Sequence, residues 1–109
     1  MINEVKLENL LLELGHAENM AGTELIRVAV RMYRPRIGLT TELYPAIAGE
    51  VGTTPGRAER SMRYAIEVAW RRGSAEAQQR LFGWSINPLR GVPTIGEYLA
   101  RLWRLCHED

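Results

Sequence analysis

The sequence predicts an all-α fold of about six helices with a central helix-turn-helix. Apolar residues recur at spacings of three and four along most of the chain, and short breaks containing Gly or Pro separate these stretches. No segment shows a convincing alternation of apolar and polar residues, the pattern typical of a β-strand. The chain has 109 residues, 46% hydrophobic and 25% charged, which is typical of one folded domain. We therefore expect residues 1–109 to form a single helical domain.

Two helices are predicted before residue 34. The first covers residues 3–14, begins with Asn3 as its N-cap, ends at Gly15, and carries Leu7, Leu10, Leu11 and Leu14 at helical spacing. The second covers residues 20–33 and repeats the pattern with Leu25, Ile26, Val28, Ala29 and Met32. The segment Arg34–Gly38 ends it, because Pro35 cannot continue a helix.

The next two helices form the central pair. We expect one over residues 41–51, with Thr41 as its N-cap and an inward face formed by Leu43, Ala46, Ile47 and Val51. The turn 52–54 follows, in which Thr54 can cap the next helix and Pro55 suits its first position. That helix is predicted over residues 55–72 and ends at Gly73.

Two shorter predictions complete the fold. Ser74 caps a helix over residues 75–82, and Thr94 caps a last helix to about Cys106, with Ile95, Tyr98, Leu99, Leu102 and Leu105 inward. Residues 87–93 are expected to form an irregular loop. The aromatic residues Trp70, Phe82 and Trp103 are expected in the core.

Net charge and cysteine content limit the function. Fourteen basic and thirteen acidic residues leave a net charge of +1, so any basic surface must be local. No apolar run approaches the roughly 18 residues of a membrane span, and we expect no membrane partner. Glu4 stands where a signal peptide would carry cations, and Cys106 is the single cysteine. We therefore expect no export signal and a cytoplasmic location.

The two faces of the helix predicted over 55–72 differ in composition. Its inward residues are Ala58, Met62, Ala65, Ile66 and Ala69, which fall within roughly 100° of arc at 100° per residue. The opposite face collects Gly56, Arg57, Glu59, Arg60, Arg63, Tyr64, Glu67 and Arg71. In a DNA-binding helix-turn-helix, the second helix lies in the major groove.

The exposed face has the chemistry that DNA requires. An arginine such as Arg57 or Arg60 can donate two hydrogen bonds to a guanine, and Glu59 can accept one from a cytosine. The hydroxyls of Thr53 and Thr54 and the helix N-terminus favour a phosphate, which the slim Gly56 lets approach. A cation at Arg57 opposes the helix dipole, which favours a functional reason for its presence.

The pattern alone leaves a second interpretation open. Amphipathic helices commonly have charged solvent faces, and Glu59 and Arg63 can pair at a spacing of four. The chain can thus equally be a helical protein-interaction module without DNA binding. A second group of arginines also has two interpretations. They either contact flanking phosphates or form a solvated face near a helix C-terminus. The group consists of Arg27, Arg31, Arg34 and Arg36.

Nothing in the sequence indicates catalysis. His16 and His107 lie at opposite ends of the chain, so no metal-ligand spacing exists. Cys106 and His107 are adjacent, and adjacent helical residues do not face each other. We expect neither enzymatic activity nor a cofactor.

The central pair resembles a known family. Residues 43–48 and 53–70 closely resemble the C-terminal effector domain of the sporulation-initiation response regulators of endospore-forming bacteria. Further matches occur at Arg72-Gly73, Leu81–Gly83 and Pro93-Thr94. The likeness extends from the first helix to the last.

The resemblance implies a transcription regulator of a two-component system, with a six-helix fold that recognises TGTCGAA-like boxes in double-stranded DNA. It places Arg57, Glu59, Arg60 and Arg63 at recognition positions and Thr53 and Thr54 in the turn. It also implies head-to-tail dimers on tandem sites and contact with the polymerase sigma subunit through roughly residues 73–85.

The sequence departs from the family pattern at three places. Tyr64 stands where the resemblance leads us to expect histidine, and Pro55-Gly56 stands where it leads us to expect Ala-Ser. The second change removes a hydroxyl that could contact phosphate. Family members also carry an N-terminal receiver domain, so we expect either an excised effector domain or a regulator without phosphoryl control.

Overall fold

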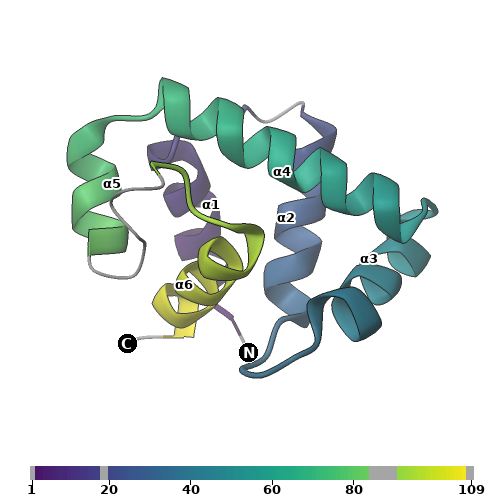
Figure 1. The fold of residues 1–109 in the computed structure, drawn as a ribbon. Helices are drawn as coiled ribbons and strands as arrows, with labels where there is room; N and C mark the ends of the chain where they lie inside the picture. The colour runs from purple at the N-terminus through teal and green to yellow at the C-terminus, as the bar shows by residue number, and fades with distance from the viewer. Residues whose placement is uncertain (1, 18–19, 84–90, 108–109) are drawn as a thin grey trace.

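The computed structural model describes residues 2–17, 20–83 and 91–107, and within these ranges it contains six α-helices and no strand. This confirms the predicted all-α class. The helices are α1 (Glu4–Glu13), α2 (Ala21–Met32), α3 (Tyr44–Val51), α4 (Pro55–Arg72), α5 (Ala75–Phe82) and α6 (Ile95–His107). Figure 1 shows α4 crossing over α2, with α3 at one end of α4 and α5 at the other. Across the described ranges, no helix combines the length and apolar character needed to span a membrane.

The predicted N-caps form hydrogen bonds at four helix starts. The Asn3 side chain accepts the Lys6 N–H at 3.0 Å, and the Ser74 hydroxyl accepts the Ala77 N–H at 3.0 Å. Thr94 and Glu97 form a reciprocal pair, with bonds of 2.8 and 3.1 Å. Thr54 caps α4. Local sequence signals therefore fix where these helices begin.

The start of the third helical segment differs from the prediction. A π-helical turn, η1 (Leu39–Leu43), precedes α3 without a break, and its N-cap is Gly38 rather than Thr41. The N–H groups of Glu42 and Leu43 both donate to the Gly38 carbonyl, at 3.0 and 2.9 Å. Leu43 and Ile47 are buried as predicted, and Tyr44 and Ala48 are buried beside them. Ala46 and Val51, also predicted inward, are exposed.

The contact between α2 and α4 is very close. All five residues predicted on the inward face of α4 are buried, from Ala58 to Ala69. Gly22 of α2 lies directly against this face. A Cβ atom on Gly22 would lie 2.3 Å from the Ser61 carbonyl oxygen and 2.6 Å from the Ala65 Cβ. Only glycine therefore fits at this helix crossing.

An aromatic group joins α4, α5 and α6. Phe82 stacks on Tyr98 with ring centroids 5.2 Å apart, and Trp70 meets Phe82 edge-on at 5.2 Å. Phe82 is buried as predicted. Trp70 and Trp103 are half-buried and pack against the edge of the core, so the prediction that they belong to the core is correct only in part.

His16, in the segment after α1, is buried and has polar partners on α2 and α6. Its Nε2 lies 2.7 Å from the Tyr98 hydroxyl, and its Nδ1 lies 3.3 Å from the Thr23 hydroxyl. Burial, together with the positive charge of Arg27, lowers the pKa of His16 to about 4. The ring is therefore neutral in the folded protein at pH 7.

The arginines at the end of α2 form ion pairs. Arg27 Nε donates to the Glu8 carboxylate at 2.8 Å, and Arg31 Nη2 lies 3.0 Å from Glu4. Arg34 pairs with Glu42 at 3.3 Å. Carboxylates of α1 and η1 thus pair with three of the four arginines. Arg31, Arg34 and Arg36 are nevertheless exposed, as the alternative of a solvated face predicts.

We predict that Gly22→Ala lowers the free energy of unfolding by about 1–3 kcal/mol, because the helices must separate to admit the methyl group. Gly49→Ala is the matched control. Nothing lies within 4 Å of a Cβ at Gly49, so this change should stabilise α3 by about 0.5–1 kcal/mol. Urea denaturation measures both. Equal effects of the two substitutions would contradict the close crossing.

We also predict a pH dependence from His16. Because its folded pKa lies below the unfolded value, protons bind the unfolded chain more strongly, and stability falls as the pH drops from 6.5 towards 4. The loss between pH 7 and pH 5 should be about 2 kcal/mol. His16→Gln should abolish most of this difference in urea titrations at the two pH values. An unchanged pH dependence in the variant would show that His16 is not its source.

Candidate nucleic-acid interface

The polar face predicted for α4 is on the outside of the protein. Arg57, Arg60, Arg63 and Arg71 are exposed, as are Gly56, Tyr64 and Glu67, and Glu59 is half-buried. Tyr64 is 60% exposed although it is a large aromatic residue. The buried side of the same helix faces α2, so these side chains point away from the core. The helix therefore presents four arginines, two glutamates and a tyrosine on one surface.

The turn between α3 and α4 is short and tightly bonded. Gly52 adopts the left-handed conformation at φ 76°, which glycine allows without steric cost. The N–H groups of Gly52 and Thr53 both donate to the Ala48 carbonyl at 2.9 Å. Thr53 is half-buried and Thr54 is exposed at the start of α4. This turn fixes the position of the N-terminal end of α4.

The N-terminus of α4 is capped by its own chain. The Thr54 hydroxyl accepts the Arg57 N–H at 3.3 Å, and the Thr54 carbonyl accepts the Ala58 N–H at 2.9 Å. A hydroxyl that accepts one hydrogen bond keeps its own O–H as a donor. Thr54 can therefore cap the helix and donate to an external acceptor at the same time.

Gly56 is not required by packing within the protein. A Cβ atom placed on it meets nothing within 4 Å, and its backbone is helical. Glycine inside a helix costs roughly 0.5–1 kcal/mol relative to alanine. No packing contact within the folded chain compensates for this cost of Gly56. The backbone beside Arg57 is therefore accessible from outside.

Glu59 and Arg63 form an ion pair on the exposed face. Arg63 Nη2 donates to a Glu59 carboxylate oxygen at 2.5 Å, across one turn of the helix. Tyr44, at the start of α3, lies beside this pair. Burial raises the pKa of Tyr44, and the Glu59 charge adds to the rise while the Arg63 charge opposes it. The pair expected as one alternative from the sequence spacing is therefore present.

The surface beside α4 includes residues that the sequence did not indicate. Arg63, Ile66 and Glu67 border a hollow of about 160 Å³ whose other side is formed by residues 92–95. Thr94 is exposed there. No local pattern relates residue 63 to residue 94, because only the packing of α6 brings them together.

Cys106 and His107, which are adjacent in the sequence, have separate surroundings in the structure. Cys106 is buried, and burial raises its pKa to about 11. His107 Nδ1 lies 2.7 Å from the Trp103 carbonyl oxygen rather than near the thiol. Within residues 2–17, 20–83 and 91–107, no three His, Cys, Asp or Glu side chains are grouped to hold a metal ion.

One comparison with known proteins agrees with this geometry. The model of the family described as "Sporulation initiation factor Spo0A C terminal" matches residues 7–105, nearly the whole chain. The match spans α3, the turn and α4, together with most of α1 and α6. The chain therefore belongs to the family of Spo0A C-terminal effector domains, which bind DNA to regulate transcription in sporulation and are not enzymes.

Proposed function

We propose that this chain regulates transcription by sequence-specific binding to double-stranded DNA, at TGTCGAA-like boxes, with α4 in the major groove. One observation supports this most directly: the helix that packs its alanine-rich side on α2 exposes Arg57, Arg60 and Arg63 together on the opposite side. A single helix with this division can enter a groove without disturbing the core.

The base-reading contacts are assigned to the first three turns of α4. Arg57 and Arg60 are exposed one turn apart, and each guanidinium can donate two hydrogen bonds to guanine O6 and N7. Arg63 follows one turn later, and the Glu59 carboxylate beside it can accept from cytosine N4.

The backbone contacts are assigned to both ends of α4 and to Tyr64 between them. Thr53, Thr54 and Gly56 lie at its N-terminal end, where a hydroxyl donor and an open backbone favour a phosphate. Tyr64 lies in its middle. Arg71 is 14 residues beyond Arg57, about 21 Å along the axis. Because the N-terminal residues of a recognition helix contact the base edges, we assign Arg71 to the sugar-phosphate backbone.

The remaining parts of the proposal rest on the resemblance to the family. Residues 1–109 form one effector domain whose helix-turn-helix covers about 41–72, and it acts in the cytoplasm, where the DNA is. Copies bind tandem boxes head to tail. The polymerase sigma subunit is contacted through roughly residues 73–85, of which 84–85 lie outside the described residues.

We predict that Arg57→Ala and Arg60→Ala each weaken binding to a TGTCGAA-type duplex by about 1–3 kcal/mol and relax specificity at one position. The reason is the loss of a two-pronged contact to one guanine. Fluorescence titration at fixed salt on this duplex and on a scrambled duplex measures the effect.

The control for these variants is Arg72→Ala, since Arg72 is exposed on α4 but lies off the arginine face. Its binding should stay near the wild-type value. Equal losses on the two duplexes for Arg57→Ala and Arg60→Ala would refute base reading and leave only phosphate contacts.

Arg71→Ala should behave differently, because a phosphate contact carries no sequence information. We predict similar weakening on the two duplexes and a plot of log K against log salt that is flatter by about one unit. The measurement is a salt series on each duplex. A loss confined to the TGTCGAA-type duplex would instead make Arg71 a base-reading residue.

A further inference from the structure

The first helix of the central pair carries a buried tyrosine at its start. Tyr44 begins α3 and is only 6% exposed, and its ring belongs to the core together with Leu43 and Ile47. The π-helical turn η1 holds its backbone, because the Tyr44 N–H donates to the Leu39 carbonyl. The fold therefore fixes both the backbone and the ring of this residue.

The hydroxyl of Tyr44 has no partner within the part of the chain that the structure describes. No described residue forms a hydrogen bond with it. A buried tyrosine usually finds such a partner, as Tyr98 does at 2.7 Å from His16 Nε2. Among the same described residues, no buried side-chain oxygen or nitrogen atom lacks a hydrogen bond. The Tyr44 oxygen is therefore not enclosed in the core but reaches the surface, where an external group can bind it.

The Tyr44 hydroxyl reaches the surface beside the polar face of α4. Figure 1 shows α3 against the N-terminal part of α4, which carries Glu59 and Arg63. Both charges act on the hydroxyl: Glu59 adds to the rise that burial causes in the pKa of Tyr44, and Arg63 opposes it. Because this pKa lies above its ordinary value of 10, the hydroxyl keeps its proton at neutral pH and remains a donor.

The charges around this hydroxyl favour an anionic acceptor. The Glu59 carboxylate is already engaged by Arg63 Nη2 at 2.5 Å, so the negative charge nearest to Tyr44 is compensated. Arg57 and Arg60, exposed on the same helix, have no ion-pair partner among the described residues. The surface around the hydroxyl is thus positive on balance. A hydroxyl donates its shortest and strongest hydrogen bonds to anionic oxygens.

We infer that the Tyr44 hydroxyl donates a hydrogen bond to a phosphate oxygen of the bound DNA. This inference rests on the proposed function, and it adds a contact from α3 to those assigned to α4 and its turn. A phosphate is favoured over a base because the first helix of a helix-turn-helix crosses the DNA backbone while the second lies in the groove.

Such a contact fixes how α4 enters the groove. Phosphate contacts set the register and orientation of a protein on the duplex without reading its sequence. Since Tyr44 is anchored in the core, its hydroxyl holds the phosphate at a defined position relative to α4. The contact is also uncharged on the protein side. It therefore adds affinity without releasing a counterion, unlike a contact from an arginine.

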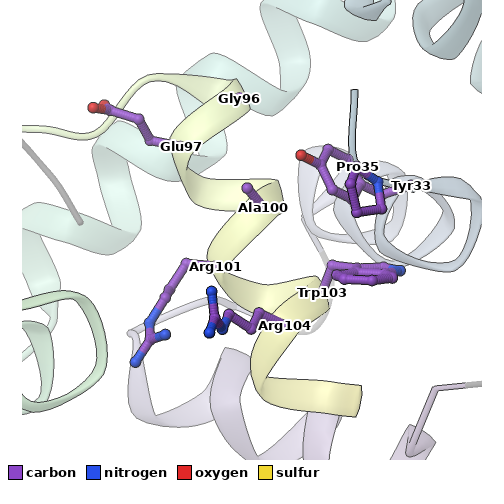
Figure 2. Close-up of a pocket in the computed structure, with 8 residues that line it drawn as sticks. All are labelled: Tyr33, Pro35, Gly96, Glu97, Ala100, Arg101, Trp103 and Arg104. Atoms are coloured by element: carbon purple, nitrogen blue, oxygen red, sulfur yellow. The ribbon is translucent and has the colours of Figure 1, made fainter. Parts of the chain in front are cut away.

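The test compares Tyr44→Phe with a matched control, Tyr33→Phe. Each substitution removes one hydroxyl and keeps the ring. Tyr33 is half-buried at the end of α2, where its ring centroid lies 5.9 Å from that of Trp103, beside the pocket that borders α6 (Figure 2). Figure 1 shows the loop that follows Tyr33 on the opposite side of the molecule from α4.

Fluorescence titrations of the wild-type chain and both variants use the TGTCGAA-type duplex and the scrambled duplex over a salt series. Tyr44→Phe should weaken binding to both duplexes by about threefold to tenfold, with the slope of log K against log salt unchanged. Tyr33→Phe should bind both duplexes like the wild-type chain. Thermal unfolding of Tyr44→Phe should stay near the wild-type temperature, because the lost hydroxyl has no described partner in the free protein.

A second measurement identifies the phosphate. Duplexes that each carry one methylphosphonate replace a single charged phosphate oxygen by a methyl group. At one position flanking the box, this replacement should weaken binding of the wild-type chain but have little further effect on Tyr44→Phe. Non-additivity of this kind indicates that the two changed groups contact each other.

Three results would overturn the inference while leaving the proposed function intact. These are equal affinities of Tyr44→Phe and the wild-type chain, additive effects at every methylphosphonate position, and a loss confined to the TGTCGAA-type duplex. The last result would mean that Tyr44 acts on base reading through Glu59 and Arg63 instead. A wild-type chain that binds neither duplex would contradict the proposed function itself, and the inference with it.

Discussion

The close crossing of α2 and α4 at Gly22 is the constraint on which the rest of the structure depends. The α2 backbone at Gly22 approaches the Ser61 carbonyl and Ala65 so closely that no side chain fits between them. Such an approach requires small residues on the facing side of α4, which Ser61 and Ala65 supply. The opposite side of α4 is exposed. The outward position of the arginines thus follows from the packing of alanines and a glycine.

A second consequence concerns where positive charge accumulates. The chain has thirteen arginines but a net charge of only +1, so its potential depends on which arginines are neutralised. Glu4 and Glu8 of α1 pair with Arg31 and Arg27, which face away from α4. Exposed ion pairs contribute little to stability, about 0–1 kcal/mol each. Their larger effect is to leave α4 as a place where cations outnumber acids, and this is the surface proposed above to contact DNA.

The sequence was sufficient for features set by neighbouring residues. The caps at Asn3, Ser74 and Thr94, and the division of α4 into a buried and an exposed side, depend on interactions within one or two turns. The predicted start of the third helix was wrong because of the π turn. This turn depends on the Gly38 carbonyl, which accepts two hydrogen bonds, and ordinary capping patterns do not reveal it. The pairing of His16 with Tyr98, and of Tyr33 with Trp103, joins residues distant in the sequence. Helix periodicity identifies an inward side but not the helix that covers it.

In the free protein, Glu59 competes with DNA for Arg63, and this competition affects the proposed binding. An exposed pair at this spacing is worth about 0.3–0.5 kcal/mol, whereas an arginine that reads a guanine contributes about 1–3 kcal/mol of discrimination. The free energy lost by breaking the 2.5 Å ion pair is therefore smaller than the free energy gained when Arg63 contacts the correct base. At a wrong base, Arg63 keeps its own carboxylate as the alternative partner. Glu59 thus competes weakly for Arg63, and this competition favours DNA in which the arginine finds a better acceptor than the one it already has.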